Sequence, residues 1–105
     1  MIKTTVARRY AQALFELLDQ SNIEPTRGTL NGLAKAMEDS LSLRHVVASP
    51  AFGVEEKIGV LTELAGRFGC PPEGKAFLGQ LVKKNRVGFL PEIGEAFAKL
   101  VDRAE

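Results

Sequence analysis

The stretch TTVARRYAQALFELLDQ, residues 4–20, decides the fold class. When its residues are placed at steps of about 100° around a helix, the polar side chains collect on one side. The apolar side chains fill the rest, an arc of roughly 200° that is wider than the stripe of about 100° on an ordinary surface helix. This pattern predicts a helix that contacts more than one neighbour. The polar set is Arg8, Arg9, Gln12, Glu16, Asp19 and Gln20, and the apolar set is Val6, Ala7, Tyr10, Ala11, Ala13, Leu14, Phe15, Leu17 and Leu18.

Two interpretations of the wide arc are open from these residues alone. A helix inside a bundle can bury both flanks against its own domain. The arc can equally form one wall of an open groove that takes an amphipathic helix from a partner. Thr4 or Thr5 is expected to cap the start of this helix, and Ser21-Asn22 to end it.

The rest of the chain also carries helical spacing. Pro25 is expected in the first turn of a second helix, and Pro91 at the start of the last. No segment alternates with period two over β-branched residues, so no strand is expected. The sequence predicts one all-α domain over residues 1–105, a compact six-helix bundle of five longer helices and one short one. The later helical segments are residues 24–41, 43–47, 54–68, 75–84 and 91–101.

Composition and motifs argue against catalysis. The formal net charge is +1, from 14 Lys and Arg against 13 Asp and Glu, so no overall positive field attracts nucleic acid. His45 is the only histidine and Cys70 the only cysteine, which leaves no ligand set for a metal. The common signatures for nucleotide, acyl and zinc chemistry do not occur. We therefore expect no catalytic residue, no cofactor and no metal.

The one dense basic cluster is Lys83-Lys84-Asn85-Arg86 at the predicted end of a helix. Cations there offset the exposed carbonyl groups of the last turn. The alternative is a small helical RNA-binding or regulatory module that uses this cluster with Arg8 and Arg9 on phosphates. Binding that falls steeply with salt would mark that alternative.

Three stretches carry a family resemblance: ARRYAQALFELL at 7–18, SPAFGVEEKIGVL at 49–61 and FLGQLVKKNRVGFLPEIGEAF at 77–97. In this order and spacing they resemble the delta subunit of bacterial ATP synthase, called the oligomycin-sensitivity-conferring protein in mitochondria. The resemblance covers nearly the whole chain. It implies a non-catalytic stator domain that helps to hold the catalytic head to the peripheral stalk during proton-driven ATP synthesis.

The resemblance also implies partners and a location. The family's subunit has an N-terminal six-helix bundle and a smaller C-terminal domain that joins the peripheral stalk, and this chain resembles the bundle alone. The expected partner is the N-terminal helix of an α subunit, with the stalk b subunit reached only through the missing C-terminal domain. No nucleic acid and no direct membrane insertion are expected. The expected location is the cytoplasmic face of the bacterial inner membrane, through the complex.

The family's bundle receives the α-subunit helix in a groove between its first and fifth helices. Carried onto this sequence, the groove has one wall from the first helix and one from the helix at 75–84. Tyr10 is the expected energetic anchor, because aromatic residues dominate interface hot spots. Phe15, Ala11 and Leu18 are expected to face the domain's own core. The predicted partner-binding residues are Val6, Tyr10, Ala13, Leu14 and Leu17 on the first wall, and Ala76, Phe77, Gln80, Leu81 and Lys84 on the second.

Overall fold

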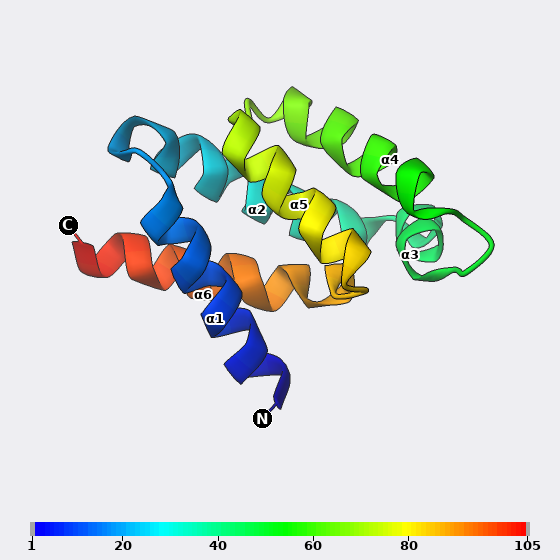
Figure 1. Ribbon diagram of the computed structural model, residues 1–105, viewed down its shortest axis with the longest axis horizontal. Coiled ribbons are helices and arrows are strands. Elements are labelled where there is room, and N and C mark those ends of the chain that lie inside the picture. Colours follow the sequence, from blue (N-terminus) through cyan, green and yellow to red (C-terminus); the bar gives the residue numbers. More distant parts are fainter. Residues whose placement is uncertain (1, 105) are drawn as a thin grey trace.

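The computed structural model describes residues 2–104, and every regular element in that range is a helix (Figure 1). The all-α prediction is confirmed, with five longer helices, the short helix α3 of 8 residues, and a single 3₁₀ turn, η1. The elements in chain order are α1 Ile2–Leu17, α2 Gln20–Asp39, α3 Leu41–Ala48, α4 Val54–Arg67, α5 Pro72–Lys83, η1 Val87–Phe89 and α6 Leu90–Ala104.

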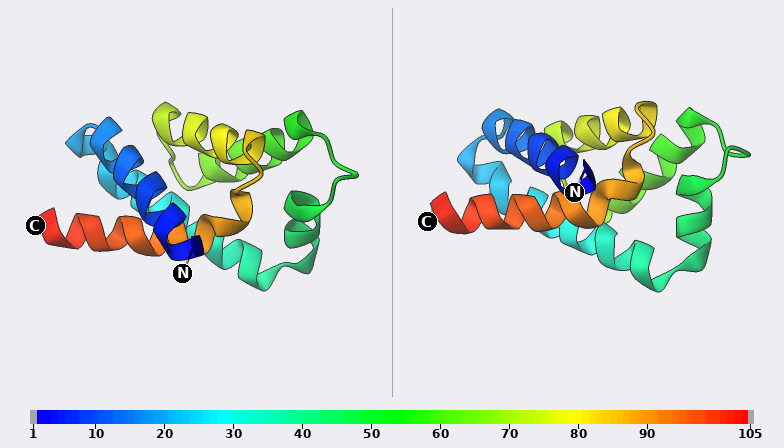
Figure 2. Two further views of the ribbon diagram at one scale, coloured as in Figure 1. Left: turned by 60° about the horizontal axis from the view of Figure 1, so that its bottom comes forward. Right: turned by 90° about the horizontal axis from the view of Figure 1, so that it is seen from below.

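The core is organised around α6, which contacts both α1 and α2 (Figures 1 and 2). Ile93, Phe97 and Val101 repeat at a spacing of four, so they lie on one side of α6, and all three are buried. The ring of Phe97 meets Phe15 of α1 edge to face, with centroids 6.0 Å apart. The last helix therefore supplies the side chains against which the first two helices pack.

A glycine allows α2 and α6 to approach closely. A Cβ atom at Gly94 would lie 3.4 Å from the Cβ of Leu30 and 3.6 Å from its carbonyl carbon. An alanine Cβ at this position would thus be in van der Waals contact with Leu30, and little space remains there for a larger side chain.

Several predicted helix ends are wrong, and proline explains the largest error. Residues 21–22 lie in the first turn of α2, which begins at Gln20 and carries Pro25 inside the helix. Proline at this position removes the hydrogen bond that an N–H would give to the carbonyl of residue 21, and its ring crowds that carbonyl. Ile23, half-buried against the core, helps to keep this turn on the bundle. Thr4 and Thr5 lie inside α1 rather than at its cap.

The other helices differ from the sequence pattern mainly at their ends. α5 starts at Pro72, because proline suits the first helical position, three residues before the predicted start. Leu61 and Ala65 of α4 are buried as the stripe predicts, but Val54 and Phe68 at its two limits are exposed. Leu41 is 74% exposed and begins α3 instead of ending α2. Side chains at helix ends project past the neighbouring helix and so escape burial.

Candidate partner-binding face

The predicted partner-binding residues meet on one side of the domain, where α1 and α5 lie next to each other. Tyr10 and Phe77 form the contact between the two helices, with their rings edge to face and centroids 6.0 Å apart. Both rings are only half-buried, so each also faces solvent. We call this surface the α1–α5 face. It is made of Val6, Tyr10, Ala13 and Leu17 from α1, of Ala76, Phe77 and Gln80 from α5, and of Lys84 directly after α5.

The α1 side of this face leaves apolar surface uncovered. Leu17 is 63% exposed, and Ala13, one turn before it, is exposed too. The opposite flank of the helix supplies the core through Ala7, Ala11 and Leu18, which are buried. A single exposed leucine is ordinary on a protein surface. Here, however, Leu17 continues an apolar row through Ala13 and Tyr10 to Val6, so part of the wide arc predicted from the sequence is open to solvent.

Two residues assigned to the walls are placed elsewhere. Leu14 is 1% exposed and Leu81 is 0% exposed, so both side chains belong to the domain's own core. A residue four places after Tyr10 is rotated by about 40° around the helix, which turns Leu14 from the face toward the interior. The two leucines therefore support the face from beneath and present no surface to a partner.

Arg86 is a component of the face that helical periodicity did not reveal. Its Nη1 donates a hydrogen bond to the Tyr10 hydroxyl at 3.5 Å, and its guanidinium carbon lies 5.8 Å from the centre of the Tyr10 ring. A guanidinium at this distance from an aromatic ring is stabilised by about 0.5–1 kcal/mol at an exposed site. The backbone brings it there because Asn85 adopts the left-handed conformation, with φ of 57°, directly after α5. This contact joins residues 76 positions apart, so no local sequence pattern could predict it.

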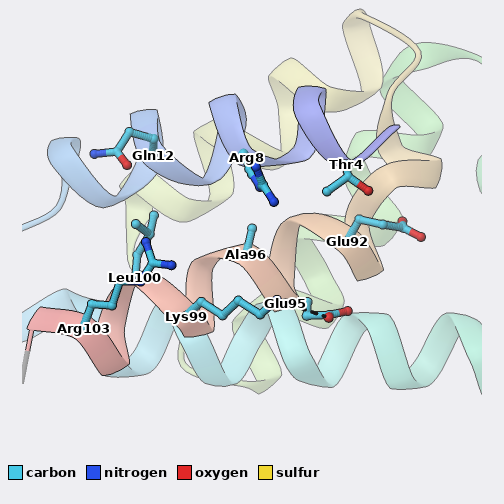
Figure 3. Close-up of a pocket in the computed structure, with 9 residues that line it drawn as sticks. All are labelled: Thr4, Arg8, Gln12, Glu92, Glu95, Ala96, Lys99, Leu100 and Arg103. Carbon is cyan, nitrogen blue, oxygen red and sulfur yellow. Dashed lines mark ion pairs between the residues drawn. The ribbon is translucent and has the colours of Figure 1, made fainter. Parts of the chain in front are cut away.

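A separate hollow of about 360 Å³ lies between α1 and α6 (Figure 3). Its charges are mixed, because Arg8 and Arg103 share the lining with Glu92 and Glu95. Lys99 Nζ lies 3.9 Å from Glu95 Oε1, which partly neutralises that side. Arg8 thus shares its surroundings with carboxylates and does not extend the basic cluster at residues 83–86. The hollow is lined by Thr4, Arg8, Gln12, Glu92, Glu95, Ala96, Lys99, Leu100 and Arg103.

The histidine and the cysteine occupy structural positions. His45 is exposed and meets the ring of Phe52 at right angles, with centroids 6.4 Å apart. Cys70 is a buried free thiol between α4 and α5. Within residues 2–104, no group of three or more histidine, cysteine, aspartate or glutamate side chains is placed to hold a metal ion.

Cys70 is expected to react slowly while the domain is folded. Burial raises the pKa of the Cys70 thiol, and this outweighs the opposing influence of Thr29 and Lys75. The thiolate is the reactive form, so a raised pKa keeps the group neutral to higher pH and slows alkylation. At pH 8 we expect iodoacetamide to label the folded domain at least about tenfold more slowly than the urea-unfolded chain. Equal rates, followed by mass spectrometry, would contradict this burial.

Sequence comparison supplies the family. The profile described as "ATP synthase delta (OSCP) subunit" matches residues 6–105. The chain belongs to this family. The α1–α5 face and the core that supports it lie almost entirely within the matched residues.

Individual relatives agree with the profile. The chain is 40% identical over 95 residues to the ATP synthase subunit delta of Phenylobacterium zucineum, a match over 90% of this chain and 52% of that protein. It is 39% identical over 108 residues to the subunit of Desulfovibrio desulfuricans, over 100% of this chain and 59% of that protein. For Anaeromyxobacter dehalogenans the identity is 34% over 104 residues, with 98% and 58% covered. The chain thus spans between about half and three fifths of the length of these relatives.

Within residues 2–104 no helix is both long enough and apolar enough to cross a membrane. α2 is the longest at 20 residues, and its charged positions include Arg27, Lys35 and Glu38.

Proposed function

We propose that this delta-family domain is a non-catalytic connector of ATP synthase whose α1–α5 face holds the N-terminal helix of an α subunit of the catalytic head. The observation that carries the proposal is the apolar row from Val6 to Leu17, half-buried at Val6 and Tyr10 and exposed at Ala13 and Leu17, beside the half-buried ring of Phe77. An amphipathic helix laid along such a row buries its own apolar side at the same time. Family membership supplies the identity of the complex.

The shape of the face suits a helix. Ala13 and Ala76 are exposed and small, so a neighbouring backbone can come close at both positions. The ring of Tyr10 contacts Phe77 and Arg86, which hold it in place. Because the ring is already fixed, little side-chain entropy is lost when a partner covers it. The face therefore offers one fixed aromatic anchor and two small exposed residues.

The role of such a joint is mechanical. In a rotary synthase the head must be kept from turning with the central shaft, so its attachment needs slow dissociation under load. Nanomolar affinity corresponds to about −12 kcal/mol, which a few well-buried anchors can supply. We propose that the domain sits on the head at the cytoplasmic face of a bacterial inner membrane, the location that the family resemblance implies. The resemblance assigns contact with the stalk b subunit to a second domain, so the proposal for residues 1–105 concerns the head alone.

A peptide titration tests the proposal. A synthetic peptide of roughly 20 residues, copied from the α subunit's N-terminus, is added to the ¹⁵N-labelled domain while amide chemical shifts are followed. Binding should shift amides in residues 6–17 and 76–84, because these line the α1–α5 face. A peptide of the same composition in scrambled order serves as the control for unspecific contact. Shifts confined to other helices, or none at micromolar peptide, would count against the assignment.

The chain offers a matched pair of variants for the same titration. Leu17→Lys places a charge on the α1–α5 face, whereas Leu41→Lys changes an equally exposed leucine on α3. Neither side chain contributes much to the core, so both variants should keep the fold. We expect the first to weaken peptide binding at least about fivefold and the second to leave it unchanged.

A further inference from the structure

Charged side chains lie along both edges of the α1–α5 face, and their sign changes from one end of the face to the other. On α1, Arg9 and Glu16 flank Ala13 at spacings of four and three residues, so the three lie along one side of the helix. Arg9 is near the start of this row and Glu16 near its end. The α1 edge of the face therefore runs from positive to negative along the chain.

The α5 edge carries the opposite order. Glu73, Gln80 and Lys84 follow one another at spacings of seven and four, which also places them along one side. Glu73 lies in the first turn of α5, and Lys84 directly follows its last residue. This edge runs from negative to positive along the chain.

The two helices run in roughly opposite directions in all three views (Figures 1 and 2). The contact of Tyr10 with Arg86 places Arg86 beside the middle of α1, close to the position of Arg9 in the sequence. The positive end of the α1 edge and the positive end of the α5 edge therefore lie at the same end of the face, and so do the two negative ends. Arg9, Lys84 and Arg86 make one end of the face cationic, and Glu16 and Glu73 make the other end acidic.

These charges are not neutralised by one another. None of the five takes part in an ion pair among the described residues. Glu16 accepts a hydrogen bond from Gln12, and Oε1 of Glu73 is buried without a hydrogen-bond partner. Arg86 is held beside Tyr10 and stays exposed. A partner helix that brings the opposite charge to each end would therefore complement these side chains.

We propose that this charge polarity fixes the direction in which a helix lies on the face, with its carboxylate-rich end against Arg9, Lys84 and Arg86 and its basic end against Glu16 and Glu73. The inference rests on the proposed docking of a helix. The apolar row supplies contact but little directional information, because it is apolar over its whole length. Charge at the rim of an interface fixes orientation and register more than it adds affinity.

Two nitroxide-labelled peptides test the direction. Both keep the apolar positions of the α-subunit N-terminal helix. One has glutamate at the solvent-facing positions of its first half and lysine in its second, and the other has these halves exchanged. Each carries the nitroxide at its N-terminus, and broadening of ¹⁵N-labelled amides shows where that end lies. We expect the glutamate-first peptide to broaden residues 6–10 and 84–86, and the lysine-first peptide to broaden residues 16–18 and 73–76.

The outcomes separate the direction from the docking itself. If both peptides broaden the same end, or if the glutamate end lies beside residues 16–18, charge does not set the direction and the inference is wrong. If the unmodified α-subunit peptide does not bind at all, the proposed function fails instead. A domain carrying Lys84→Glu with Glu16→Lys, both at exposed positions, should weaken the end preference of the two peptides. An unchanged preference in this variant would also overturn the inference.

Discussion

Replacing Phe97 with alanine should lower the free energy of unfolding by about 3–5 kcal/mol, the largest single loss expected in this domain. Phe97 is 0% exposed and its ring packs edge to face on Phe15. The substitution removes apolar contact and leaves a cavity where α6 meets α1. Domains of this size are stable by about 5–15 kcal/mol, so a substantial fraction of that stability would disappear. Urea unfolding followed by circular dichroism measures the change.

Leu41→Ala is the control for the Phe97 variant. Leu41 is 74% exposed at the start of α3, so its truncation should change the free energy of unfolding by less than about 0.5 kcal/mol. A loss below about 1 kcal/mol for Phe97→Ala would mean that α6 does not form the centre of the core.

Tyr10→Ala should weaken binding of the α-subunit peptide by at least about 1–2 kcal/mol, roughly 5- to 30-fold in Kd. The substitution removes the ring that lies between α1 and α5 and that Phe77 and Arg86 hold in place. Tyrosine at the centre of an interface combines a large apolar area with few rotatable bonds, so its loss is costly. Isothermal titration calorimetry of both proteins with the same peptide measures the difference.

Tyr10→Phe keeps the ring and removes only the hydroxyl. Because the hydrogen bond from Arg86 is long at 3.5 Å, this variant should bind within about threefold of the parent. Equal weakening by both substitutions would show that the hydroxyl, rather than the ring, carries the contact. An unfolding curve of Tyr10→Ala establishes that the domain remains folded, since the ring is only half-buried.

The fold class could be predicted because each long helix carries its own apolar periodicity. Ile93, Phe97 and Val101 are buried as their spacing requires, and the same holds for Leu30 and Leu33. Helix ends depend on contacts that no window of sequence contains. Pro25 is an example, since a proline in the first turn of a helix and one a turn later leave the same local pattern in the sequence.

The candidate face was predictable in outline and not in detail. The apolar arc on α1 is wider than one neighbouring helix can cover. The exposure of Ala13 and Leu17 agrees with that. Which edge of the arc stays open depends on where α5 and α6 pack, and for this reason Leu14 was misplaced. Arg86 contacts Tyr10 because the chain changes direction at Asn85, which has a positive φ. Periodicity within one helix cannot predict such a contact.

The position of α6 has a consequence for synthesis of the protein. During translation α1 emerges from the ribosome before α6, yet the side chains that cover its inner flank belong to α6. Formation of the core must therefore wait until Val101 has left the exit tunnel. Until then the apolar side of the nascent first helix stays accessible to chaperones, and a chain interrupted before that point would be a substrate for proteolysis.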